Sequence, residues 1–161
     1  MVRAFLGLGT NLGDRHANLR AALGALAHIS PVESVSGIWE TAPLYVVDQP
    51  AFLNMAVGLV TDLPPLDLLR QLKILETELG RVASIRFGPR LIDLDILFYD
   101  DTVMDDEILT LPHPRLTERR FALAPLAEIA GGLTHPISGL TVASLLANLP
   151  EDDEIRFIGA L

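Results

Sequence analysis

The sequence predicts an α+β domain on the ferredoxin-like βαββαβ plan, a sandwich of helices and strands with helical and edge-strand additions towards the C-terminus. Short apolar runs bounded by turn residues are typical of strands, and two longer segments carry leucines at helical spacing. These segments follow one another in the order β-α-β-β-α-β. Half of the 161 residues are apolar, which suffices for one core at this length, so we expect a single domain over residues 1–161.

The first half of the plan comprises a strand, a helix and two further strands, expected at residues 2–8, 15–28, 32–39 and 52–61. The first strand ends in G-L-G-T-N-L-G-D, in which Asn11 or Asp14 is expected to cap the helix. Gly58, inside the last of these strands, predicts a bulge. The connection over residues 40–50 is too long for a hairpin turn, and loops of this length are usually functional.

The second half begins with a helix over residues 66–79, which follows Pro64 and Pro65 and is stopped by Gly80. An arginine-bearing loop and a strand over residues 91–98 come next. Further on we expect a short edge strand, a proline-rich loop, a helix and a last helical turn, at residues 102–104, 110–116 and 121–130 and near Val142.

Asp93 and Asp95 interrupt an apolar strand, where acidic residues are disfavoured. Positions i and i+2 of a strand share a face, so both carboxylates should point to the side of Leu91 and Leu97. The opposite side should carry Ile92, Leu94, Ile96 and Phe98. We expect this strand to be central in the sheet and its carboxylate face to be buried, which requires a cation between the two charges. Hard oxygen ligands suit Mg²⁺ held jointly with substrate phosphates; a solvated or turn-capping aspartate pair is the alternative.

The net charge is −9, which argues against general binding of nucleic acids or anionic membranes, because both need a broad cationic surface. The arginines nevertheless gather in two loop-like stretches, Arg81, Arg86 and Arg90 in the first and Arg115, Arg119 and Arg120 in the second. The guanidinium fork suits phosphate, so we expect a small polyanion there. Polar loops without a ligand are the alternative.

The sequence does not contain the residues or motifs that several other kinds of site require. The chain has no cysteine, and therefore no disulfide, thiolate metal site or cysteine nucleophile. Leu12 stands where a dinucleotide-binding turn needs glycine, no P-loop motif occurs, and the four histidines lack the spacing of a zinc site. No apolar run approaches the length of a membrane span and the N-terminus does not resemble a signal peptide, so we expect a cytoplasmic protein.

Four segments carry a family resemblance: G-L-G-T-N-L-G-D, T-A-P-L-Y-V-V-D-Q-P-A-F-L-N, R-F-G-P-R-L-I-D-L-D-I-L and L-P-H-P-R-L-T-E-R-R-F. Together, and in this order from residue 6 to 121, they resemble the 6-hydroxymethyl-7,8-dihydropterin pyrophosphokinases of folate biosynthesis. The resemblance implies Mg²⁺-dependent transfer of the β,γ-pyrophosphoryl group of ATP to the hydroxymethyl oxygen of the pterin, with release of AMP. We expect a monomeric catalytic domain that takes these two small molecules and binds neither nucleic acid nor membrane.

By this resemblance, Asp93 and Asp95 hold two Mg²⁺ ions that bridge the triphosphate, and Asp95 lies nearest to the attacking hydroxyl. Arg81 and Arg90 are the phosphate-contacting arginines of a mobile loop and complete the catalytic set with Asp95. We expect residues 80–89 to form a mobile lid that closes over ATP. The nucleotide side also includes Glu76, Arg86, His113 and Arg119. The pterin pocket includes Thr41, Pro43, Leu44 and Asn54, with the ring sandwiched between Phe52 and Phe121.

The chain departs from the family pattern at Ala83 and Pro114, where other members carry arginine and tyrosine, and at Phe87, where tryptophan occurs. These changes concern individual ATP contacts. Two other functions remain open at this point. A different Mg²⁺-dependent glycosyl or nucleotidyl transferase would explain the aspartates but not the aromatic, asparagine-bearing segment. A regulatory module that binds a small molecule on the same plan would not need the aspartates.

Overall fold

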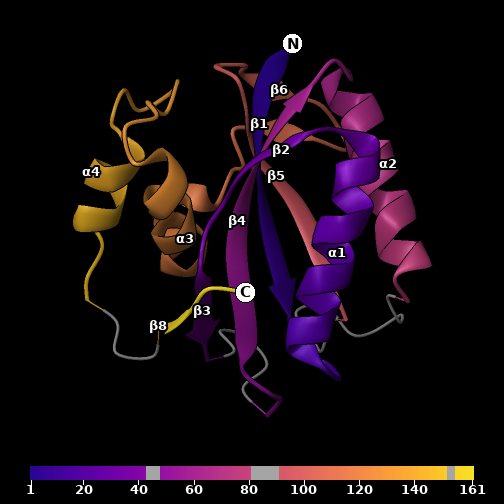
Figure 1. Ribbon diagram of the computed structural model, residues 1–161. Coiled ribbons are helices and arrows are strands. Elements are labelled where there is room, and N and C mark those ends of the chain that lie inside the picture. Colours follow the sequence, from indigo (N-terminus) through magenta and orange to yellow (C-terminus); the bar gives the residue numbers. More distant parts are fainter. Residues whose placement is uncertain (43–47, 81–90, 152–154) are drawn as a thin grey trace.

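The computed structural model describes residues 1–42, 48–80, 91–151 and 155–161 (Figure 1). Within these ranges the strands and helices are β1 Val2–Thr10, α1 Arg15–Ile29, β2 Val32–Val35, β3 Ile38–Thr41, β4 Phe52–Thr61, α2 Pro65–Glu78, β5 Asp93–Tyr99, β6 Met104–Asp105, β7 Thr110–Leu111, α3 Arg120–Ala130, α4 Val142–Ala147 and β8 Ile155–Gly159. A 3₁₀ turn, Leu116–Glu118, precedes α3. None of the helices in these ranges has the length and apolar character needed to cross a bilayer.

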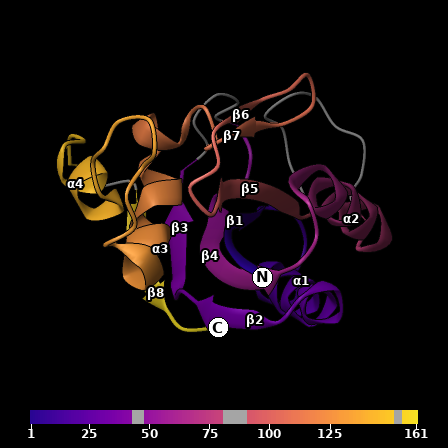
Figure 2. The ribbon, with the colours of Figure 1, turned by 90° about the horizontal axis from the view of Figure 1, so that it is seen from above.

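One antiparallel sheet organises the fold. Its strands follow the order β5-β1-β4-β3-β8, and β2 pairs with β4 beside β3. Helices α1 and α2 lie against one face of this sheet, and α3 and α4 lie against the other (Figures 1 and 2). The predicted mixture of helices and strands is therefore confirmed, as three layers with a core on each side of the sheet.

Helices α1 and α2 form where the leucine spacing predicted them. The Asp14 carboxylate caps α1 by accepting a hydrogen bond from the Ala17 backbone N at 3.1 Å. Pro65 opens α2 directly after Pro64, as expected for the first helical turn. Each fully buried leucine stabilises the fold by roughly 1.5–3 kcal/mol. The side chains that attach both helices to the sheet are Leu19, Ala22 and Leu26 of α1 and Leu68, Leu72 and Leu75 of α2.

Strand β5 differs from its prediction in two respects. It ends the strand order and, among the described strands, pairs only with β1, so the expectation of a central strand is wrong. The register passes from Phe5 opposite Phe98 to Leu6 opposite Ile96, which leaves Leu97 as a bulged residue. Leu97 and Phe98 consequently both pack towards α3 and α4, whereas Ile96 packs towards α1 and α2. The prediction that Phe98 shares the side of Ile96 is therefore also wrong.

The second strand, expected over residues 32–39, consists of two strands, β2 and β3. Ser36 interrupts it and uses its hydroxyl to accept a hydrogen bond from the Ala56 backbone N at 2.8 Å. The bulge expected at Gly58 lies on the partner strand, because the register of β2 shifts just before Ser34, which pairs with Gly58. Strand β4 itself runs without interruption along β1.

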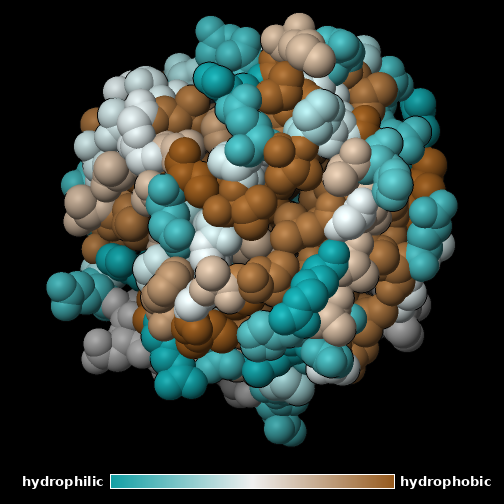
Figure 3. All heavy atoms as spheres, in the orientation of Figure 1, coloured by the Kyte–Doolittle hydropathy of each residue, from teal (hydrophilic) through white to brown (hydrophobic). Residues whose placement is uncertain are grey.

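The C-terminal additions are only partly as expected. The edge strand predicted at residues 102–104 is displaced to β6, which pairs with β7 in a separate two-stranded sheet. Strand β8 was not predicted; it pairs with β3 and extends the main sheet. In the view of Figure 3, apolar side chains reach the surface between the two helical layers. Val35 of β2 and Phe157 of β8 are among the exposed apolar residues of the described chain.

Candidate active site

Strands β5, β1 and β4 place sequence-predicted residues side by side on one face of the sheet. The register pairs Asp93 with Gly9, and Gly9 with Asn54; the neighbouring pair joins Asp95 to Gly7. Directly opposed residues of antiparallel strands project to the same face. The aspartates therefore stand at one end of a row across three strands and Asn54 at the other, with a glycine between them.

This row is open to solvent at the end that carries the aspartates. Asp95 is exposed, and Asp93, Gly9 and Phe52 are half-buried, so the expectation of a buried carboxylate face is wrong. An exposed carboxylate loses little solvation and keeps its oxygens available to a cation. Carboxylates are hard donors that fit Mg²⁺, which takes few protein ligands and completes its coordination with phosphate and water. Within the described ranges no group of three or more His, Cys, Asp or Glu residues is arranged to hold a metal ion.

Asn54 is buried beside Thr41 at the other end of the row. Its Nδ2 donates hydrogen bonds to Thr41 Oγ1 at 3.0 Å and to the Trp39 carbonyl at 3.3 Å. Because these bonds use the two amide hydrogens, Oδ1 is the acceptor that faces the row. Phe52 lies two residues before Asn54 on β4, on the same face, so a ring and a hydrogen-bonding group are presented together.

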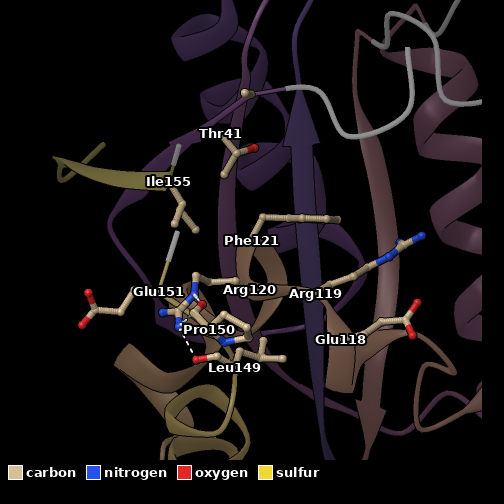
Figure 4. Close-up of a pocket in the computed structure, with 10 residues that line it drawn as sticks. Thr41, Glu118, Arg119, Arg120, Phe121, Leu149, Pro150, Glu151 and Ile155 are labelled. Atoms are coloured by element: carbon tan, nitrogen blue, oxygen red, sulfur yellow. Dashed lines mark hydrogen bonds between the residues drawn. The ribbon is translucent and has the colours of Figure 1, made fainter. Parts of the chain in front are cut away.

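A hollow of about 290 Å³ lies where the ends of α3 and β3 meet the chain after α4 (Figure 4). Thr41 and Phe121, both predicted for the pterin, line it together with Arg119, predicted for the nucleotide. The other wall comes from the C-terminal part of the chain, including Pro150 and Ile155. The hollow thus brings together residues from three separate stretches of sequence.

Arg119 and Arg120, which belong to the second arginine cluster, make different contacts. Arg120 donates through Nη2 to the carbonyls of Leu149 at 3.0 Å and Pro150 at 2.8 Å, and so fastens α3 to the segment after α4. Arg119 extends the opposite way (Figure 4). Its guanidinium carbon lies 5.5 Å from the centre of the Phe121 ring, and its Nε is buried without a hydrogen-bond partner among the described residues. Arg119 therefore lies against the Phe121 ring, whereas Arg120 is used in holding the segment after α4.

His113 lies close to both Asp95 and Arg119. Burial lowers the pKa of His113 below its usual value; the Asp95 carboxylate raises it, and Arg119 and Arg115 lower it further. Its Nδ1 accepts a hydrogen bond from the Arg115 backbone N at 3.3 Å. In the neutral ring the proton therefore sits on Nε2, which can donate to an acceptor such as a phosphate oxygen.

Glu76 stands apart from the row, on α2 at the outer edge of β5. It is 2% exposed, and its Oε2 accepts a hydrogen bond from the Leu94 backbone N at 2.8 Å. Its Oε1 lies 3.2 Å from Lys73 Nζ. Through its hydrogen bond with Leu94, Glu76 connects α2 to β5, the strand that carries the aspartates.

Five of the predicted site residues lie outside the described residues: Pro43, Leu44, Arg81, Arg86 and Arg90. Nearly all of the predicted lid over residues 80–89 lies there too. Their assignments remain predictions.

Sequence reasoning missed the contribution of the N-terminal turn and of the C-terminal segment. Asn11, one of the two residues considered as the helix cap, is buried and donates to Gln49 Oε1 at 3.0 Å and the Pro50 carbonyl at 2.9 Å. Arg15 donates to the Ala51 carbonyl at 2.9 Å. These three bonds hold the chain that leads into Phe52. The polar G-T-N-L-G-D turn was a visible signal, but its partner segment is not deducible from local spacing.

Comparison with known proteins agrees across sequence and structure. The sequence pattern of the family described as 7,8-dihydro-6-hydroxymethylpterin-pyrophosphokinase (HPPK) matches residues 5–131. A protein of Bacillus subtilis named 2-amino-4-hydroxy-6-hydroxymethyldihydropteridine pyrophosphokinase is 48% identical over 128 residues, which cover 78% of this chain and 77% of that protein. One of the same name from Methylorubrum extorquens is 46% identical over 151 residues, 92% of this chain and 94% of that protein.

Longer relatives match as well. The folic acid synthesis protein fol1 of Pneumocystis carinii is 42% identical over 92% of this chain, which spans only 20% of that protein. Among solved structures, Plasmodium falciparum HPPK-DHPS with pteroate superposes with a TM-score of 0.74 at 16% identity, over 91% of this chain and 44% of that one. At this identity the superposition supports the fold alone.

Proposed function

The chain belongs to the 7,8-dihydro-6-hydroxymethylpterin-pyrophosphokinase family, and from this membership we propose that it transfers pyrophosphate from ATP to 6-hydroxymethyl-7,8-dihydropterin in folate biosynthesis. In this reaction the hydroxymethyl oxygen forms a bond to the β-phosphorus of ATP. The bond from that phosphorus to the oxygen bridging to the α-phosphorus breaks, AMP leaves, and the hydroxyl proton is released. The observation that carries the proposal is the open row with Asp93 at one end and Asn54 at the other.

We propose that Asp93 and Asp95 hold Mg²⁺, two ions by the family resemblance, together with the triphosphate. The bound metal would neutralise charge on the triphosphate and on the departing AMP. The side chains hold their carboxylates on one open strand face, which leaves coordination positions for phosphate oxygens. Asp95, the more exposed of the two, is the proposed catalytic carboxylate nearest to the attacking hydroxyl.

On the nucleotide side, the described candidates are His113 and Arg119. The neutral His113 ring presents Nε2–H, and Arg119 presents a guanidinium whose Nε has no partner among the described residues. Both groups are donors suited to phosphate oxygens. We propose the same role, from the resemblance, for Arg81, Arg86 and Arg90, with Arg81 and Arg90 acting in catalysis, and a place beside the nucleotide for Glu76.

On the pterin side, we propose that Phe52 and Phe121 stack on the two faces of the ring while Asn54 and Thr41 bind its polar edge. Phe52 and Asn54 share a strand face, and Phe121 and Thr41 line the same hollow. Stacked aromatic rings and a few convergent polar groups suit a planar heterocycle. Pro43 and Leu44 complete this pocket in the proposal.

The proposal is tested by AMP formation from ATP, measured with and without the hydroxymethyl dihydropterin. AMP should form only with the pterin and Mg²⁺. Asp95→Asn keeps the size of the side chain but removes its charge, so turnover should fall by several orders of magnitude while the fold persists. Asp101→Asn, on an exposed residue just after β5, is the matched control and should keep its activity. Near-normal turnover of Asp95→Asn would show that the site is misassigned.

The same assay separates the other candidate functions. A different nucleotide transferase would consume ATP with an acceptor other than the pterin. A regulatory module would bind its ligand without releasing AMP. Calorimetric titration with a non-hydrolysable ATP analogue, with and without Mg²⁺, distinguishes the two, because only the transferase needs the metal for nucleotide binding.

We also propose that residues 1–161 work as one catalytic domain, as a monomer in the cytoplasm, where ATP is available. We further propose that the main sheet and its helices follow the ferredoxin-like βαββαβ topology. The strand order supports it, because β5, β1, β4 and the combined β2 and β3 correspond to strands four, one, three and two of that plan. Sedimentation analysis of the active protein tests the oligomeric state.

A further inference from the structure

The face of the sheet between the aspartates and Asn54 has a glycine floor. Gly9 is half-buried although it lies on β1, between two neighbouring strands. Its cross-strand partners are Asp93 and Asn54. A glycine inside a strand usually marks a bulge, a tight bend, or the close approach of another group.

Among the residues that the structure describes, neither backbone conformation nor packing explains this glycine. Gly9 is not among the glycines with positive φ, so its backbone is open to an L-residue. A Cβ at this position would lie 3.6 Å from Asn54 Oδ1 and 3.8 Å from Phe52 Cδ1, which is ordinary van der Waals contact. Gly58 is different, because a Cβ there would collide with Ser34 Oγ.

The two atoms nearest to that missing Cβ are the proposed ligand contacts. Asn54 Nδ2 already donates to Thr41 and Trp39, so Oδ1 is the atom left to accept an N–H from a ligand. A methyl group at position 9 would stand beside this oxygen and beside the ring edge of Phe52. It would therefore take space from a ring that stacks on Phe52 and donates to Asn54.

We propose that Gly9 is a specificity-determining residue of the pterin slot. Its lack of a side chain keeps the floor clear for a flat nitrogen heterocycle with a donor N–H on the edge that meets Asn54. This inference rests on the proposed function. The inference adds Gly9, on a third strand, to the residues of the slot. In this proposal the Gly9 backbone contacts the ring, and a side chain at this position would exclude the ring.

Gly9→Ala tests the inference directly. The free protein should tolerate the methyl group, so the melting temperature should be unchanged or higher than that of the wild type. Fluorescence titration with 6-hydroxymethylpterin should show affinity weakened by about tenfold or more, which is ~1.4 kcal/mol. Affinity for the Mg²⁺ complex of a non-hydrolysable ATP analogue should stay within about twofold of the wild type, because the added atoms lie beside the pterin contacts. KM for the pterin should rise more than kcat falls.

Gly24→Ala is the matched control. Gly24 lies on α1, and apart from the backbone of its own helix and its chain neighbours no atom of the described residues lies within 4 Å of its missing Cβ, so the same substitution there should leave both ligand affinities unchanged. Unaltered pterin affinity of an active Gly9→Ala protein would overturn the inference and leave the proposed function intact. Weakening of both ligands together with a lower melting temperature would also overturn it, by showing a structural role. Failure of the wild-type chain to form AMP would overturn the proposed function itself.

Discussion

Glu76 offers a quantitative test of how the carboxylate strand is supported. It is 2% exposed, accepts from the Leu94 backbone N at 2.8 Å, and lies 3.2 Å from Lys73 Nζ. Glu76→Ala leaves the Leu94 N–H buried without this acceptor, which costs roughly 1–3 kcal/mol. Loss of the pair with the half-exposed lysine adds about 0–1 kcal/mol. We therefore expect the free energy of unfolding to fall by about 1–4 kcal/mol, and the melting temperature by roughly 2–16 °C for a domain of this size.

Urea denaturation monitored by circular dichroism measures this loss. Glu76→Gln keeps an oxygen that can accept from Leu94, so it should lose less than half as much. Glu78→Ala, on the exposed side of the same helix, is the control and should stay within about 0.5 kcal/mol of the wild type. A Glu76→Ala protein as stable as the Glu78→Ala protein would refute the reasoning. The affinity of Glu76→Gln for a Mg²⁺-ATP analogue separately tests the nucleotide-side role implied by the family resemblance.

Three further predictions concern packing, a surface link and pH. Gly58→Ala should lower the free energy of unfolding by roughly 1–3 kcal/mol in urea denaturation, because its Cβ would collide with Ser34 Oγ; an unchanged midpoint would contradict this packing. Glu128→Ala removes the acceptor of Trp39 Nε1 at 2.9 Å and should cost about 1–2 kcal/mol, with a change in tryptophan fluorescence; an unaltered spectrum would count against the contact. Because burial holds the pKa of His113 below its usual 6.5, its contribution to stability is complete above about pH 6.5 and is lost as the pH falls through the lower folded value. Urea denaturation between pH 7.5 and 5 should therefore show a smaller loss for His113→Gln than for the wild type, and equal losses would contradict the assignment.

Local patterns predicted the first two helices and the shared strand face of the two aspartates well. The leucine spacing located α1 and α2, and the alternation around Asp93 and Asp95 placed both on one face, because both signals depend only on residues close in sequence. The position of β5 at the sheet edge was not predictable in this way. It depends on which strands pair, and that is decided by contacts between distant segments.

The candidate active site also depends on contacts between distant segments, which local patterns do not predict. Sequence reasoning named Thr41 and Phe121 but could not show that Ile155 would complete the hollow, because β8 reaches it only by pairing with β3. It assigned one role to the second arginine cluster, whereas Arg119 and Arg120 point to opposite sides. The bulge at Leu97 shifted Phe98 to the other core, a single-residue change in register that alternation alone does not reveal.

The outer edge of β5 has a consequence for how the molecule behaves at high concentration. An edge strand with free backbone groups is a template for pairing with another chain, and such pairing is a common start of aggregation. Here the Leu94 N–H is taken by Glu76, and the Leu97 carbonyl accepts from the His113 backbone N at 3.0 Å. Two groups that a foreign strand would need are therefore already satisfied. We therefore expect the strand that carries the acidic pair to resist strand addition, which would place another backbone beside Asp95.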